Sequence, residues 1–466
     1  MALHDEEALH FEDRMSDLES LMWRLEQIEP SLLSTMTLMA VFDRPLDRNR
    51  LGEKLEVLTR RVPRLRDRVD AGPLPMVPPT WVPDPDFSID NHLAWRAAAH
   101  PGDLSALLRV AEEDVASAFE PARPPWHLTV VEGLDDDREA LIARLHHSYT
   151  DGQGAVRIAM ELFDFEADPP PVLTMPDLPP PPMLPLFGRT VADVMHEASR
   201  TASVVRSIAP WLASSLRSVL SDPEQVAGPV RALIRSVGEL AAEALTPGST
   251  LLADRGPGLR LSEMRVDLEH MRRAARIGGG KINDVFLAGI LGGLGRYHDK
   301  HGNASKAVRL GIPVSTRSDG TVMRNQLQGI LMVGPLDINE PLDRLKMVHD
   351  LVLHTRAQPW LDFIDAGASA ALRMPAANQL LASAVRSTDA LASNLPGPPV
   401  PLFMAGASVQ RLIPFGPRAG SALNLTLLSY QGEASIGVNS DPSAVPDPDV
   451  LLDCLGAGFD EVLALA

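Results

Sequence analysis

The stretch LIARLHHSYTDGQGAVRIAMELFDF, residues 141–165, places two adjacent histidines between two patterned segments. The residues before His146 are mostly apolar, as in a buried strand, whereas those after Gly152 recur at the three-to-four spacing of an amphipathic helix. The segment therefore predicts a strand, a turn that carries His147 and Asp151, and then a helix.

Adjacent side chains on a strand point to opposite faces, so one histidine can enter a cleft while the other packs behind it. Histidine has an ordinary pKa near neutrality, which suits it to removing a proton from an alcohol at pH 7. We therefore favour an acid–base centre here.

Two other interpretations of the histidine pair stay open. The first is a metal site of two histidines and a carboxylate, although adjacent histidines diverge. The second is a capped turn with solvated histidines.

The composition indicates a globular protein with a large core. The chain has 466 residues, of which 45% are hydrophobic and 22% charged, and this length favours two or three domains. A net charge of −18 argues against nucleic acid as a partner. The single cysteine, Cys454, rules out a disulfide framework. The acidic N-terminus is unlike a secretory signal, and no apolar run is long enough for a membrane span. We expect a cytoplasmic protein that is not secreted.

A proline-rich stretch divides the chain. Half of the residues in DPPPVLTMPDLPPPPMLP, residues 168–185, are prolines, which cannot supply the amide donors of a helix or an inner strand. We predict an N-terminal domain over 1–167, a linker with connecting helices over 168–250, and a C-terminal domain over 251–466. Strands are expected at 32–46, 126–134, 306–315, 328–336, 423–430 and 434–439, and helices at 51–62, 103–119 and 190–245. The predicted fold class is α/β, in two domains.

Several familiar motifs do not occur. No GxSxG is present, so a serine-hydrolase elbow is not expected. RIGGGKIN, residues 276–283, lacks the pattern of a phosphate loop, because Ala275 stands where the first glycine belongs and Ile282 follows the lysine in place of a hydroxyl residue. The glycine spacing of a dinucleotide fold is also missing.

HHSYTDG, residues 146–152, matches the HHxxxDG signature of the coenzyme A-dependent acyltransferase superfamily, which includes the condensation domains of peptide synthetases. Further stretches resemble, in order, blocks of the bacterial wax ester synthase/diacylglycerol acyltransferase family: RPPWHLTVVEGL (123–134), KINDVFLAGILGGL (281–294), IPVSTR (312–317), SNLPGPPVPLFMAGASV (393–409) and LNLTLLSYQGEASIGVNSD (423–441). One departure is Pro125, where the family usually has leucine before Trp126. The resemblance covers nearly the whole chain.

This resemblance implies two chloramphenicol-acetyltransferase-like α/β domains that form a pseudo-dimer with the active site at their interface. Acyl-coenzyme A would enter from one face and a lipophilic alcohol from the other. His147 would be the general base, with His146 a structural member of the motif and Gly152 its last residue. Arg317 is the expected partner of Asp151. No acyl-enzyme, metal or cofactor beyond the co-substrate acyl-coenzyme A is needed, because positioning of two bound substrates supplies much of the rate.

Four further residues are candidates for substrate binding. Asn283 and Asp284 precede an apolar helical run, so they either cap a helix or support the site, with Asn283 expected to point inward. Ser393 and Asn394 either form a turn before prolines or, as the resemblance implies, stabilise the tetrahedral oxyanion. Trp126 is expected in the core.

The expected function is O-acyl transfer from acyl-coenzyme A to diacylglycerol, forming triacylglycerol, or to long-chain alcohols, forming wax esters. One alternative is an acyltransferase that acts on polyketide or glycolipid hydroxyls. Another is a non-catalytic lipid-droplet or acyl-binding protein with the same fold. The arginine-bearing segment at 190–245 predicts either peripheral contact with a membrane or lipid inclusion, or a helical connector.

Overall fold

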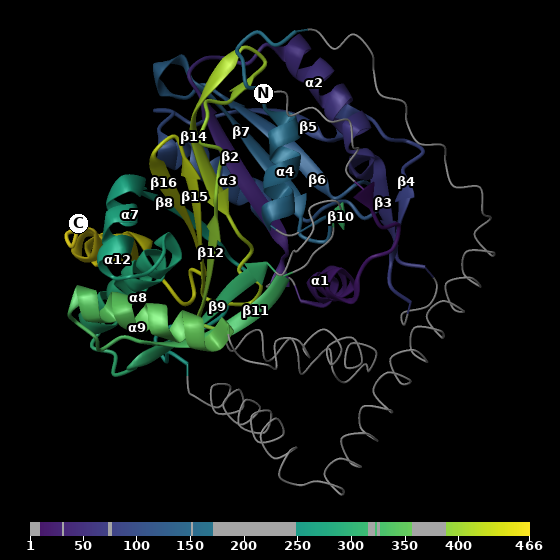
Figure 1. Ribbon diagram of the computed structural model, residues 1–466. Coiled ribbons are helices and arrows are strands. Elements are labelled where there is room, and N and C mark those ends of the chain that lie inside the picture. Colours follow the sequence, from purple (N-terminus) through teal and green to yellow (C-terminus); the bar gives the residue numbers. More distant parts are fainter. Residues whose placement is uncertain are drawn as a thin grey trace, which may run out of the picture.

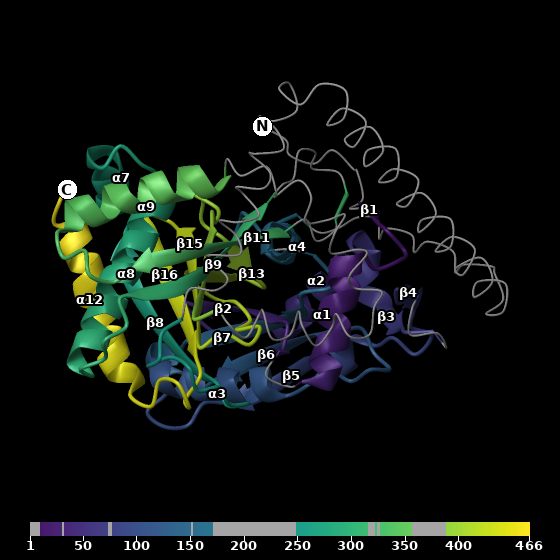
Figure 2. The same ribbon diagram turned by 90° about the horizontal axis from the view of Figure 1, so that it is seen from below.

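The computed structural model describes residues 10–29, 32–72, 77–150, 152–170, 248–315, 322–323, 327–356 and 388–466. They form two sheet-centred bodies that lie side by side (Figures 1 and 2). Four sequence predictions lie outside the described residues: Asp151, Arg317, the proline-rich stretch beyond residue 170, and the helices at 190–245.

The N-terminal body is built on a six-stranded sheet. Its order is β13 (Phe403–Met404), β14 (Ala407–Phe415), β2 (Thr35–Phe42), β7 (Glu139–His146), β6 (Trp126–Glu132) and β5 (Leu93–Ala97). Helix α3 (Leu104–Ala116) covers one face, while α1 (Asp17–Ile28), α2 (Arg48–Arg61) and α4 (Gly152–Leu162) lie toward the other. The small strands β3 (Asp67–Asp70) and β4 (Thr80–Pro83) pair beside it, and β1 (His10–Phe11) pairs with β10 (Val322–Met323).

Strand β7 shows how the sequence produces this layering. Ala140 and Ile142 pack with the residues of α3, whereas Leu141 packs in the core on the opposite face. This alternation buries both faces of the strand, which accounts for its nearly continuous apolar run. The strands and helices expected at 32–46 and 51–62 are confirmed as β2 and α2.

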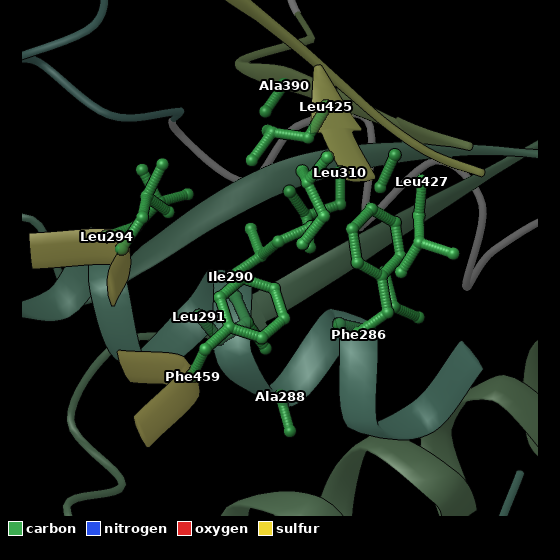
Figure 3. Close-up of a cluster of buried hydrophobic side chains, with 14 of the residues drawn as sticks. Phe286, Ala288, Ile290, Leu291, Leu294, Leu310, Ala390, Leu425, Leu427 and Phe459 are labelled. Carbon is green, nitrogen blue, oxygen red and sulfur yellow. The ribbon is translucent and has the colours of Figure 1, made fainter. Parts of the chain in front are cut away.

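The C-terminal body has a second six-stranded sheet. Its order is β11 (Leu327–Pro335), β9 (Ala307–Ser315), β12 (Ala390–Leu395), β15 (Leu423–Tyr430), β16 (Glu433–Ser440) and β8 (Arg260–Asp267). Its helices are α7 (Leu268–Ile277), α8 (Ile282–Lys300), α9 (Pro341–Arg356) and α12 (Pro448–Leu463), which gather on one side of it (Figure 2). Figure 3 shows Phe286 and Ile290 of α8 and Phe459 of α12 meeting Leu310 and Leu425 of the sheet in one apolar core.

The glycine-rich run of α8 serves close helix packing. A Cβ added to Gly458 of α12 would lie 2.3 Å from the backbone nitrogen of Gly293, and one added to Gly293 would lie 2.6 Å from Cα of Leu455. The two backbones approach this closely only because neither glycine has a side chain. Across the ranges that the structure describes, no helix is long and apolar enough to cross a membrane.

The C-terminal part of the chain contributes a strand to the N-terminal sheet. Strand β14 lies late in the chain but pairs antiparallel with β2 of the N-terminal sheet, with Ile413 opposite Met39. It crosses over β16 at Gly437, where a Cβ would lie 1.8 Å from the carbonyl oxygen of Pro414. The N-terminal sheet is therefore completed by a strand from beyond residue 251, and the domain limits expected from the sequence stay a prediction.

Candidate active site

The histidine pair lies where strand β7 gives way to a turn. His146 is the last residue of β7 and pairs with Thr35 of β2. The backbone N–H of His147 continues this pairing by donating to the carbonyl oxygen of Ser34 at 2.8 Å. Helix α4 begins at Gly152. The strand, turn and helix expected at residues 141–165 are thus confirmed.

His146 is held on both sides of its ring. It is 1% exposed, and its Nδ1 accepts the backbone N–H of Ser148 at 3.0 Å, while its Nε2 lies 2.9 Å from Oε2 of Glu26. Oγ of Ser148 also lies 2.7 Å from Nδ1 and can donate to it. Since a backbone amide can only donate, we assign Nδ1 as the acceptor and place the proton on Nε2, which donates to Glu26. Trp23 packs edge-on against the ring, with 5.1 Å between the centroids. Both ring nitrogens are engaged within the protein, so His146 has no nitrogen left for a substrate.

Glu26 of α1 is the acceptor for this ring. Burial opposes ionisation of Glu26, but the hydrogen bond from His146, the Ser34 amide and nearby Arg144 together lower the pKa of its carboxyl below the ordinary value. The carboxyl is therefore ionised at neutral pH, where it can accept both hydrogen bonds. This interaction joins residues 120 positions apart in the chain.

His147 is the other ring of the pair and is 8% exposed. The turn behind it is packed into the protein. Tyr149 is buried against Trp81, with 4.7 Å between the ring centroids, and burial raises the pKa of its phenol well above the ordinary value. Thr150 is fully buried next to Gly154, where a Cβ would lie 1.8 Å from the Thr150 hydroxyl. The backbone that presents His147 is thus held by strand pairing on one side and a packed turn on the other.

The turn meets the C-terminal body at strand β12. A Cβ added to Gly152 would lie 3.0 Å from Cδ2 of Leu395, so the HHxxxDG and SNLPG blocks are brought together. Ala392 of β12 packs in the C-terminal core, whereas Leu395 packs in the N-terminal one. By strand alternation Ser393 lies on the same face as Leu395, toward the N-terminal body, and Asn394 lies on the opposite face. Ser393 is the better placed of the two candidates.

Asn283 and Asp284 lie in the first turn of helix α8. Oδ2 of Asp284 accepts the backbone N–H of Lys281 at 2.8 Å and lies 2.9 Å from Nδ1 of His349, so this carboxylate caps the helix. Nδ2 of Asn283 is buried, and within the described part of the chain it has no hydrogen-bond partner. A part for either residue in substrate binding stays a prediction.

Two residues of the site carried no recognisable sequence signal. Glu26 and Ser34 touch the motif only because α1 and the start of β2 fold against the end of β7. The one available hint was that Trp23 and Glu26 stand three residues apart, on one face of a helix. Trp126 is buried as expected, and its Nε1–H donates to the carbonyl oxygen of Leu65 at 2.7 Å. Within the described ranges, no three His, Cys, Asp or Glu side chains gather into a group that could hold a metal.

Two α/β bodies that share a strand, with the histidine pair at their seam, define a protein of the chloramphenicol-acetyltransferase-like fold. Solved structures agree on the fold. The chain is 20% identical to the wax ester synthase/diacylglycerol acyltransferase from Marinobacter aquaeolei VT8, with a TM-score of 0.64 over 96% of this chain and 98% of that one. The first condensation domain of the calcium-dependent antibiotic synthetase gives a TM-score of 0.61 at 15% identity, over 97% and 95% of the two chains.

Sequence comparison then assigns the family. Residues 15–286 match the wax ester synthase/diacylglycerol acyltransferase catalytic domain, and residues 323–462 match the C-terminal domain of the same family. A Mycobacterium tuberculosis protein, provisionally named a diacylglycerol O-acyltransferase, is 32% identical over 99% of this chain and 94% of its own length. A second, named a probable diacylglycerol O-acyltransferase, is 29% identical over 85% and 83%. The chain belongs to the wax ester synthase/diacylglycerol acyltransferase family, and it is an acyltransferase.

Proposed function

We propose that this protein transfers a fatty acyl group from acyl-coenzyme A to the free hydroxyl of diacylglycerol, with His147 as the general base. The observation that carries the assignment of the base is the occupation of both ring nitrogens of His146 by Ser148 and Glu26. Of the two motif rings, we therefore assign His147 to the substrate. Diacylglycerol is favoured as the acceptor because it is the substrate in the names of the mycobacterial relatives.

In the proposed reaction, His147 takes the proton of the acceptor hydroxyl while the oxygen attacks the thioester carbonyl. The tetrahedral oxyanion is stabilised by a hydrogen-bond donor, for which the Ser393 hydroxyl is the best-placed candidate in its block; such a donor is typically worth about 3 kcal/mol. The C–S bond then breaks, the ester forms, and the leaving thiolate takes the proton from His147. The products are triacylglycerol and coenzyme A, and the ring returns to its neutral state.

The lipophilic acceptor implies contact with a lipid surface, which we include in the proposal. The protein is expected to sediment with anionic liposomes or lipid inclusions at low salt. The arginine-bearing segment at 190–245 is the part of the sequence that favours this binding, because amphipathic segments that carry arginine beside apolar residues can lie on anionic lipid. Absence of co-sedimentation at any salt concentration would contradict the lipid-surface part of the proposal alone.

The test is an assay of purified protein with palmitoyl-coenzyme A. Diacylglycerol, hexadecanol, and polyketide and glycolipid acceptors with free hydroxyls are offered in parallel, thiol release is followed, and the lipid products are separated by thin-layer chromatography. Triacylglycerol formation supports the proposal, and wax ester formation alone would reassign the acceptor. Thiol release only with polyketide or glycolipid hydroxyls would reassign it to secondary metabolism, and no release with any acceptor would indicate a non-catalytic lipid-binding protein. His147→Ala is expected to lower kcat roughly 10²- to 10⁴-fold.

A further inference from the structure

We propose that Glu26 is a positioning residue for acyl transfer, which acts through His146 and Ser34 to hold His147 in its working orientation. This inference rests on the proposed role of His147 as general base. Glu26 lies on helix α1, outside the HHxxxDG motif, and touches no reacting atom in this scheme. Its effect is exerted on the backbone that presents the base.

The contacts form a closed ring of hydrogen bonds. A single carboxylate oxygen, Oε2 of Glu26, lies 2.9 Å from the backbone nitrogen of Ser34 and 2.9 Å from Nε2 of His146. The carbonyl oxygen of Ser34 accepts the backbone N–H of His147 at 2.8 Å. The peptide bond between His146 and His147 completes the ring. The base is therefore tied to Glu26 along two routes, one through a side chain and one through a strand.

Helix α1 gives this carboxylate a fixed place. A capping box at the helix start joins Ser16 and Glu19, with the Ser16 backbone N–H 2.8 Å from Oε2 of Glu19. One turn before Glu26, Trp23 packs on the ring of His146, and Arg24 donates to the carbonyl oxygen of Val77 at 2.6 Å. The helix is thus anchored at its start and over the turn before Glu26, so the position of Oε2 does not depend on the glutamate stem alone.

Loss of this acceptor changes the turn itself. Without Glu26 the Nε2–H of His146 has no partner, which removes the reason for that tautomer. A proton on Nδ1 would oppose the backbone N–H of Ser148 at 3.0 Å and would have to be donated to the Ser148 hydroxyl, which lies 2.7 Å from Nδ1, so the ring and the turn would shift relative to each other. A displacement of about 1 Å at a reacting group can cost on the order of 10²-fold in rate.

The experiment compares two near-isosteric substitutions. Glu26→Met removes the acceptor while filling a similar volume, and we expect it to lower kcat about 10- to 100-fold with an unchanged KM for palmitoyl-coenzyme A. Glu26→Gln keeps an acceptor oxygen and should restore kcat close to the wild-type value. Glu139→Met is the matched control: this buried carboxylate accepts the backbone N–H of Leu46 at 2.9 Å at the other end of β7, so the substitution should cost stability and leave kcat unchanged.

A second measurement is independent of turnover. Imidazole ¹⁵N resonances of histidine-labelled wild-type protein should show His146 as the Nε2–H tautomer, with a hydrogen-bonded Nδ1. Glu26→Gln should keep this signature, and Glu26→Met, where it folds, should lose it. An Nδ1–H tautomer in the wild type, or equal kcat losses in Glu26→Met and Glu139→Met, would overturn the inference. Wild-type protein that releases no thiol would instead overturn the proposed function, while the tautomer would still test Glu26.

Discussion

At the scale of single residues, the two adjacent histidines do different work. His146 shares two buried hydrogen bonds with Ser148 and Glu26, whereas His147 is assigned to the substrate. His146→Ala should therefore lower the melting temperature and the activity together, since it leaves the partly buried Glu26 carboxylate short of a partner at a cost of about 1–3 kcal/mol. His147→Ala should lower activity alone. Paired thermal melts and initial rates check this, and a His146→Ala variant as stable as wild type would contradict it.

Asp67, partly buried beside Arg64, makes the stability of the fold depend on pH. Burial raises the pKa of this carboxyl to about 6, from 3.8, although Arg64 at 3.6 Å acts in the opposite direction. A folded-state pKa above the unfolded one means that Asp67 contributes stability below about pH 4, and that this contribution is lost as the pH rises through about 6. The change amounts to roughly 2–3 kcal/mol at about 1.4 kcal/mol per pKa unit.

Asp67→Asn does not titrate, so it isolates this contribution. The free energy of unfolding of the variant minus that of wild type should become more positive as the pH is raised from 4.5 to 7, because the wild type loses stability and the variant does not. Urea unfolding at the two pH values measures the difference. Finding the same difference at both would show that Asp67 has an ordinary pKa.

At the scale of secondary structure elements, two glycines of helix α12 predict opposite outcomes for one substitution. A Cβ on Gly456 would have no neighbour within 4 Å, whereas one on Gly458 would lie 2.3 Å from the backbone nitrogen of Gly293. Gly456→Ala should therefore stabilise the protein by about 0.5–1 kcal/mol through helix propensity. Gly458→Ala should destabilise it by about 1–3 kcal/mol, because α8 must move away. Chemical denaturation of both variants is the measurement, and equal shifts in one direction would refute this packing.

Local sequence patterns were sufficient for the elements but not for their partners. Alternation and helical spacing predicted β2, β6, β7, α2 and α3, because those signals lie within a dozen residues. Nothing local says that β14 pairs with β2, or that Glu26 meets His146, since these contacts join distant segments that compete with many alternatives of equal local quality. The same limit left Ser393 and Asn394 equivalent until the register of β12 separated their faces.

At the scale of the whole molecule, the two bodies are expected to unfold together. Besides strand β14, the carboxylate of Glu112 in α3 accepts the backbone N–H of Leu261 at 2.8 Å and lies 3.1 Å from Arg260 at the edge of the other sheet. Arg411 of β14 also pairs with Glu263 of β8. Calorimetry should therefore show a single unfolding transition. Gly437→Ala, which forces β14 away from β16, should lower the melting temperature of that one transition without splitting it. Two resolved transitions would contradict this coupling.

Strand β14 also determines how relatives of this protein can be recombined. A chimera that joins the first half of one enzyme to the second half of another, with a single crossover before residue 248, would set β14 of one parent against β2 of the other. Every hydrogen-bonded pair between β14 and β2 would then join residues of two different parents, and β2 lies next to the strand that ends in the histidine turn. Three crossovers, which divide the chain into four segments, avoid this: the second crossover falls before β13 and the third after Phe415, so that residues 403–415 travel with the N-terminal parent. Chimeras made to change substrate preference within this family should therefore take residues 403–415 from the same parent as the N-terminal sheet.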